Sequence, residues 1–182
     1  MSIRHGLLAL LRSEPKYGYQ LRAEFEAATG STWPLNIGQV YTTLTRLERD
    51  GLVRATGADD EGRSRYELTD TGAKELGQWF ETPVARESRP RDELVIKLAL
   101  ALTVPGIDVT AVVQRQRSAT MRSLQELTRT KRATDHDDPD QAAALLVVES
   151  MIFSAEAEIR WLDHCESTIP RRTSRRTTGA QE

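Results

Sequence analysis

Cysteine is nearly absent from this sequence: Cys165 is the only one among 182 residues, so the chain cannot form an internal disulfide. A chain without disulfides fits a reducing compartment, and we therefore expect a cytoplasmic protein. Long apolar runs are missing as well, since none approaches the roughly 20 residues that a membrane-spanning helix needs. The short apolar stretch at residues 7–11 is followed at once by Arg12 and Glu14. It is therefore predicted to belong to a folded helix and not to a signal peptide.

Residues that carry catalytic or metal chemistry are also scarce. The chain has three histidines, and only His164 has a cysteine beside it, Cys165. Adjacent residues of a helix point about 100° apart, so this pair does not converge on one ligand. We predict no catalytic residue, no metal site and no cofactor, and an enzyme is the least favoured class of function.

No single sign of charge dominates, because 25 basic and 27 acidic residues give a net charge of -2. The distribution is nevertheless uneven. Residues 81–132 carry 10 basic and 6 acidic side chains, whereas residues 133–169 carry 1 basic and 9 acidic ones. A surface that binds DNA must place cations where phosphates will lie. We therefore expect the acidic block at 133–169 to serve a purpose other than contact with DNA.

Apolar periodicity and capping residues predict three short helices and a β-hairpin in the first half of the chain. The helices are expected at about 2–12, 18–28 and 37–50, the last of them capped by Asn36 and stopped by Gly51. Strands at 52–55 and 63–68 flank the polar turn GADDEG, and a further helix follows at 70–80. Three helices followed by a hairpin are the layout of a winged helix-turn-helix.

The second half of the chain is predicted to be helical. A linker at 82–90 precedes helices at 91–103, 108–132 and 140–167. The predicted fold class is thus mainly α (α+β), with a winged helix-turn-helix DNA-binding domain at 1–82 and a helical dimerisation domain at 83–169. Effector sensing by this second domain is left open. The basic tail at 170–182 is predicted to be disordered.

The third predicted helix has one apolar and one polar face. Four apolar residues fall within about 80° of arc and are expected to face the core: Ile37, Val40, Leu44 and Leu47. The opposite face carries Gln39, Thr42, Arg46 and Arg49, with Thr43 and Thr45 at its flanks. Glutamine can pair with adenine, arginine with guanine, and threonine can contact a thymine methyl group. The alternative is an ordinary solvated face, against which the threonines argue because threonine is a mediocre helix former.

The predicted wing contains two arginines, Arg63 and Arg65, which share one strand face because they alternate with Ser64 and Tyr66. Such a strand can lie on the phosphate backbone or reach into a minor groove. Ordinary surface charge is the alternative. The acidic residues at the tip weaken the DNA interpretation and are candidates for holding the arginines instead: Asp59, Asp60 and Glu61.

The last predicted helix carries an apolar seam with spacings of 3, 4, 3, 4 and 3, which is a heptad pattern. Its members are Leu145, Val148, Ile152, Ala155, Ile159 and Leu162. One alternative is packing onto residues 1–12 of the same chain. We expect the helix to do both, with one face on the first helix and the other on a partner subunit. A symmetric homodimer would present two recognition helices to a palindromic site.

Three segments resemble the PadR family of bacterial regulators: LLALLRSEPKYGYQL at 7–21, GQVYTTLTRLERDGLV at 38–53 and RSRYELTDTGAKEL at 63–76. The second half is similar to the longer PadR-like proteins in architecture only. The resemblance implies a dimeric winged-helix regulator, usually a repressor, whose C-terminal helices pair the two subunits. It also implies that Tyr17, in the Tyr-Gly-Tyr turn, and Tyr41, in the recognition helix, lie near phosphates.

The sequence therefore predicts a transcriptional regulator that binds double-stranded DNA as a homodimer, with a small-molecule effector as a further partner and no membrane association. The predicted DNA-binding residues are Tyr17, Asn36, Gln39, Tyr41, Thr42, Thr43, Arg46, Arg63 and Arg65. The competing hypothesis is a winged-helix module that binds another protein and never DNA. The acid-free face of the third helix argues against that alternative.

Overall fold

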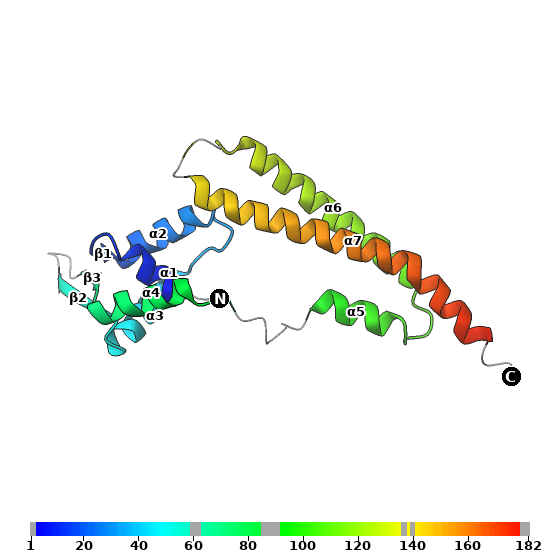
Figure 1. Cartoon of the computed structure of the whole chain (residues 1–182), viewed down its shortest axis with the longest axis horizontal. Helices are drawn as coiled ribbons and strands as arrows, with labels where there is room; N and C mark the ends of the chain where they lie inside the picture. Colours follow the sequence, from blue (N-terminus) through cyan, green and yellow to red (C-terminus); the bar gives the residue numbers. More distant parts are fainter. Residues whose placement is uncertain (1–2, 59–62, 85–91, 136–137, 139–140, 179–182) are drawn as a thin grey trace. The chain divides into compact units, whose positions relative to one another are not determined.

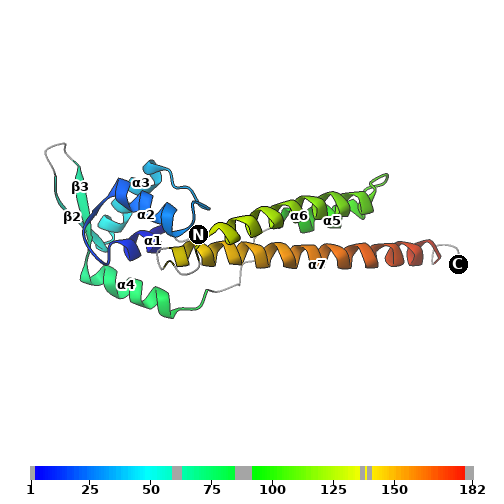
Figure 2. The same cartoon turned by 90° about the horizontal axis from the view of Figure 1, so that it is seen from above.

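The computed structural model describes residues 3–58, 63–84, 92–135, 138 and 141–178 (Figures 1 and 2). The chain divides into two compact units, one of Met1–Ala85 with Asp138–Ala144 and one of Arg86–Asp137 with Leu145–Glu182. The predicted acidic wing tip and most of the predicted linker lie outside the described residues. Within the described part, no helix combines the length and the apolar character that crossing a membrane requires.

The first unit confirms the predicted helices and hairpin. It contains α1 (Ile3–Leu10), β1 (Lys16–Tyr17), α2 (Gly18–Ala28), α3 (Ile37–Arg49), β2 (Val53–Ala58), β3 (Ser64–Leu68) and α4 (Asp70–Glu81). The strands form an antiparallel sheet of order β1-β3-β2. A mainly helical chain with this small sheet has the predicted winged helix-turn-helix fold.

Two details of the sheet differ from the prediction. Strand β1 was not expected, because two residues are too short to show a hydrophobic period. It pairs with β3 in the register Lys16 to Tyr66 and Tyr17 to Arg65. Strand β2 also continues past its predicted end at Ala55, through an irregularity between Thr56 and Ala58. The intervening Gly57 has a φ of 55°, which glycine adopts at little cost.

Helix α3 is fixed at its start by a capping box and along its length by the core. The Asn36 side chain accepts a hydrogen bond from the Gly38 N–H at 2.8 Å, and the Gln39 side chain accepts one from the Asn36 N–H at 3.3 Å. Val40, Leu44 and Leu47 are fully buried in a cluster with leucines of α1, α2 and α4.

Ile37 is the exception to the predicted core face of α3. Its side chain is 36% exposed, whereas the sequence pattern placed it in the core. Ile37 is the first residue of α3, and its neighbours Asn36 and Gly38 are exposed as well. Periodicity describes the direction in which a residue points and carries no information about the depth at which it lies.

The second unit contains α5 (Glu93–Ala101), α6 (Val109–Ala133) and α7 (Ala142–Thr178). Helices α6 and α7 run antiparallel and side by side in both views (Figures 1 and 2). Leu98 of α5, Val113 of α6 and Leu162 of α7 form a small buried cluster. The three helices thus share one core.

The acidic residues of α7 have a structural purpose, as their separation from the basic segments suggested. Four of them bind polar or basic side chains of α6. The pairs are Glu149 with Lys131 at 2.6 Å, Glu158 with Gln116 at 3.0 Å, Asp163 with Arg117 at 2.6 Å and Glu166 with Gln114 at 2.6 Å. Four acidic side chains of the block therefore contribute contacts between α6 and α7.

The predicted dimerisation seam also faces the inside of this unit. Val148, Ile159 and Leu162 are 7%, 9% and 0% exposed, while Leu145, Ile152 and Ala155 are half-buried. Leu162 packs with residues of α5 and α6 of the same chain. A spacing of 3 and 4 shows that a helix is packed along that seam, but it does not show which chain supplies its partner.

Helix α7 extends to Thr178, beyond its predicted end at about Ser167. The backbone of residues 170–178 is therefore helical, where the sequence suggested a disordered tail. Residues 171–178 contain no glycine or proline, and arginine is a favourable helix former. The polar composition of this segment is typical of a disordered tail, but polar residues alone do not end a helix.

Candidate nucleic-acid interface

The polar face of α3 lines an open groove on the surface of the first unit. The groove is bordered by Ile3 of α1, by the N-cap Asn36 and by five residues along α3: Gly38, Gln39, Thr42, Thr43 and Arg46. Five of the nine predicted DNA-binding residues therefore come together in one place. Thr43 is half-buried and the other four are exposed.

The threonine hydroxyl groups on α3 donate their hydrogens to the helix itself. Thr42 Oγ1 donates to the Gly38 carbonyl at 2.8 Å, and Thr43 Oγ1 donates to the Gln39 carbonyl at 2.7 Å. Each hydroxyl then offers only lone pairs to an external molecule, beside a methyl group. These threonines are therefore suited to accept from a base amino group or to contact a thymine methyl.

The two arginines at the end of α3 differ in their surroundings. The Arg49 guanidinium donates two hydrogen bonds to Asp50, at 3.1 and 3.0 Å. Arg46 has no hydrogen-bond or ion-pair partner among the residues that the structure describes, and its side chain is exposed beside the groove. Arg46 can therefore turn its fork of donors toward an external acceptor without breaking a contact.

Asp50, the C-cap of α3, is neutralised from two sides. Arg4 of α1 binds Asp50 at 2.6 Å and also binds Glu75 of α4 at 3.3 Å. The hydrogen bond from Arg4, followed by that from Arg49, holds the pKa of Asp50 below its usual 3.8. The negative charge of Asp50, at the end of the polar face, is thus compensated by Arg4 and Arg49, which reduces its repulsion of an approaching anion.

The wing arginines lie against an aromatic ring. The guanidinium carbons of Arg65 and Arg63 are 4.8 and 5.7 Å from the centroid of the Tyr17 ring. Tyr19 stacks on Tyr17 with 5.5 Å between centroids. On the other face of β3, burial raises the pKa of the Tyr66 phenol above its usual 10.0. The predicted acidic partners of the arginines lie outside the described residues.

Tyr41 packs on the backbone of Gly18, the middle residue of the Tyr-Gly-Tyr turn. A Cβ atom at Gly18 would lie 2.9 Å from two ring carbons of Tyr41, closer than real Cβ atoms come. The Tyr41 side chain is nevertheless 40% exposed. Sequence reasoning did not identify this role of Gly18, although a glycine between two tyrosines is the signal that points to a close approach.

These elements define a winged helix-turn-helix DNA-binding domain: a capped helix with an exposed polar face, next to a hairpin that carries basic residues. Among the described residues, no group of three or more metal-ligating side chains is gathered.

Comparison with known proteins assigns the domain to a family. Residues 7–78 match the model of the "Transcriptional regulator PadR-like family", and residues 90–169 match "Virulence activator alpha C-term". The chain is 28% identical over 185 residues to "Probable transcriptional regulator Rv1176c" of Mycobacterium tuberculosis, an alignment that covers 93% of this chain and 98% of the relative. Residues 7–78 thus match the PadR-like transcriptional regulators, and the relative that aligns over almost the whole chain is also named a transcriptional regulator.

Solved structures share the fold over most of the chain. Bacillus subtilis PadR in complex with operator DNA has a TM-score of 0.67 at 20% identity, covering 91% of this chain and 97% of that one. The same protein in complex with p-coumaric acid has a TM-score of 0.72 at 20% identity, covering 92% and 98%. The Vibrio cholerae virulence activator AphA has a TM-score of 0.69 at 23% identity, covering 94% and 99%.

Proposed function

We propose that this protein is a repressor that binds a palindromic operator as a homodimer, with α3 in the major groove. The observation that carries the proposal is the acid-free polar face of α3. On this face Arg46 has no partner among the described residues, while the neighbouring Arg49 is bound to Asp50. A solved structure with the same fold, B. subtilis PadR, is a complex with operator DNA, which supports the proposal that this chain binds DNA.

The side chains on this face suit the major groove in size and chemistry. The groove is about 12 Å wide and admits a helix whose outer side chains are short. Thr42 and Thr43 supply acceptors and methyl groups, and Arg46 supplies a fork of donors that matches the acceptor edge of guanine. Gln39 keeps its amide nitrogen available while its oxygen accepts from the Asn36 N–H.

A matched pair of variants tests the proposal. Duplexes are selected from a random pool with the wild-type protein, and the variants are then compared on the enriched duplex and on a scrambled one. Arg46→Ala should lower the preference for the enriched duplex by about 5- to 150-fold per half-site, the worth of one bidentate contact to a base. Arg49→Ala, the control, should leave the preference within about twofold because Arg49 is already paired. Equal losses in both variants would contradict the proposed role of this face.

The competing hypothesis, a module that binds only proteins, makes a different prediction. The phosphate-dependent part of binding strengthens steeply as salt is diluted. A wild-type protein that binds no duplex in dilute salt would therefore favour the protein-binding alternative.

For the homodimer, we propose the exposed face of α7 in place of the buried seam. At 100° per residue this face lies on the opposite side of α7 from the seam. Leu146 and Phe153 are 68% and 67% exposed on it. A shallow groove there is lined by Glu149 and by the small residues Ser150, Ser154 and Ala157. Large residues beside small ones make the face self-complementary, which suits a two-fold contact with a second copy of this chain.

The oligomeric state of a matched pair of variants tests this surface. Phe153→Glu should convert the dimer into a monomer in sedimentation equilibrium, because it places a charge in an apolar contact. Phe80→Glu is the control, since Phe80 in the first unit is equally exposed at 66%. A Phe153→Glu variant that stays dimeric would show that another surface pairs the subunits.

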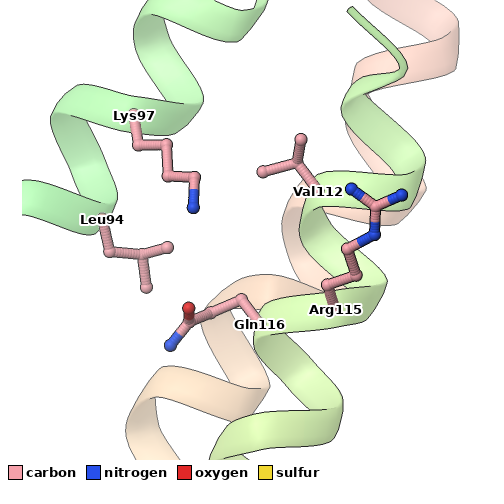
Figure 3. A pocket seen from close by; sticks show the side chains of 5 residues that line it. All are labelled: Leu94, Lys97, Val112, Arg115 and Gln116. Carbon is pink, nitrogen blue, oxygen red and sulfur yellow. The ribbon is translucent and has the colours of Figure 1, made fainter.

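We propose the cavity between α5 and α6 as the site of a small-molecule effector (Figure 3). It has a volume of about 170 Å³ and is lined by Leu94 and Lys97 of α5 and by Val112, Arg115 and Gln116 of α6. Two apolar and two cationic side chains suit a molecule with an apolar body and a negative group. The cavity is smaller than the roughly 300 Å³ at which sites for drug-sized ligands begin, so a single-ring compound is the expected size.

The p-coumaric acid complex of B. subtilis PadR motivates the choice of probe. We expect p-coumaric acid at millimolar concentration to release the wild-type protein from its duplex. The combined Lys97→Gln and Arg115→Gln variant should bind the duplex normally and resist release. Arg122→Gln, an exposed position further along α6, serves as the control. Equal release of all three proteins would exclude this cavity.

A further inference from the structure

Tyr17 is held at a fixed position by the two elements that meet at it. Its main chain pairs with Arg65 of β3, and it is the residue that precedes the first turn of α2. Its N–H donates to the Gln20 side chain at 2.9 Å, which closes the start of that helix. The direction of the Tyr17 side chain is therefore set by strand pairing on one side and by helix capping on the other.

The Tyr17 ring contacts both the wing arginines and a second aromatic ring. Arg63 and Arg65 project from the same face of the wing, and both guanidinium groups are within about 6 Å of the ring centroid, the range of a cation–π contact. The Tyr19 ring is stacked on Tyr17 with an interplanar angle of 14°. One fixed ring thus contacts both arginines of the strand.

We propose that Tyr17 is a positioning residue, which acts through its ring by holding Arg63 and Arg65 in the orientation that contacts the phosphate backbone. The inference rests on the proposed binding of DNA. A guanidinium group that stacks on a ring uses its flat face, so the N–H groups at its edge stay available to phosphate oxygens. Holding two flexible side chains in advance reduces the entropy that they lose on binding.

The family resemblance implied that Tyr17 lies near phosphates, and a direct contact between its hydroxyl and a phosphate would be a different role. The two roles depend on different atoms of the same side chain. Positioning needs the ring and not the hydroxyl, whereas direct contact needs the hydroxyl. Substitutions that remove one and keep the other therefore separate them.

The experiment compares Tyr17→Phe and Tyr17→Leu in the full-length protein, by fluorescence anisotropy with the enriched duplex at low salt. Tyr17→Phe should bind within about twofold of the wild type, and Tyr17→Leu should bind about tenfold more weakly, because two exposed cation–π contacts are lost. Equal losses in both variants would overturn the proposal in favour of hydroxyl contact. An unchanged affinity of Tyr17→Leu would overturn it as well.

A double-mutant cycle excludes a merely structural effect. When Arg63→Ala and Arg65→Ala are already present, Tyr17→Leu should have no further effect on affinity. An additive loss would show that Tyr17 acts on DNA binding by another route. If Tyr17→Leu does not fold, Tyr17→Met, an unbranched side chain without a ring, takes its place.

A measurement without DNA distinguishes failure of this inference from failure of the proposed function. In the DNA-free protein, the ring current of Tyr17 should shift the Arg65 Hδ proton signals upfield in wild type and Tyr17→Phe, but not in Tyr17→Leu. The absence of that shift in the wild type overturns the contact itself. Its presence in a protein that binds no duplex overturns the role in DNA binding together with the proposed function.

Discussion

The salt dependence of DNA binding provides a quantitative prediction for the wing. Each cation that neutralises a phosphate adds about 0.9 to the slope of log affinity against log salt. Arg63→Ala combined with Arg65→Ala removes two such cations from each subunit, and four from a dimer. The slope should therefore become shallower by about 3.6 in the double variant. Between about 50 and about 200 mM salt, the wild type should lose about 150-fold more affinity than the variant.

The assay is fluorescence anisotropy with one labelled duplex at four or more salt concentrations. A decrease of about 1.8 would indicate that the wing of only one subunit contacts DNA or that a monomer binds. Arg54→Ala is the control, because Arg54 lies on β2 of the same hairpin but is ion-paired with Glu67 of β3. An unchanged slope in the double variant would refute the conclusion that the wing contacts phosphates.

Two further predictions concern stability. Gly72→Ala should destabilise the fold by about 3 kcal/mol in urea denaturation, because a Cβ there would lie 2.1 Å from a backbone oxygen. Gly77→Ala in the same helix is the control, since its Cβ would meet nothing within 4 Å, and it should be neutral or stabilising by up to about 1 kcal/mol. Equal effects of the two substitutions would contradict this packing. Hydrogen bonds from the Arg22 side chain and, secondly, from the Leu35 N–H hold the pKa of Glu26 below its usual 4.5. The carboxylate of Glu26 therefore stabilises the fold above pH 4.5, and this stabilisation is lost as the pH falls through the lowered pKa. The melting temperature of Glu26→Gln should accordingly fall below that of the wild type near neutral pH and converge with it in acid, and a gap that is independent of pH would contradict the assignment.

The elements that the sequence predicted best are those with local signals at their ends. Helix α3 begins after the predicted cap Asn36 and ends before Gly51, because capping residues and a glycine stop act on their immediate neighbours. The same holds for α4, which begins after Thr69, whose side chain accepts the Gly72 N–H at 3.0 Å. The polar face of α3 could be predicted because three buried residues of the same helix fix its opposite side.

Features that depend on distant partners could not be derived in this way. The heptad seam of α7 was predicted as a packed surface, and its residue Leu162 packs on α5 and α6 of the same chain, which the spacing alone could not indicate. Strand β1 exists only because it pairs with β3, about 50 residues further along the chain. The contact of Tyr17 with the wing arginines follows from that pairing, so no local pattern in the sequence predicted it.

The central claim is that α3 lies in the major groove, twice in each symmetric complex. Affinity cleavage tests it most directly, with a DNA-cutting iron chelate attached to Thr45→Cys in a Cys165→Ser background. Thr45 is exposed at the flank of the polar face, and Cys165 is the only native cysteine. We predict two clusters of cuts related by a two-fold axis, about one helical turn or a multiple of it apart. A single cluster, or cuts spread evenly along the duplex, would contradict the account.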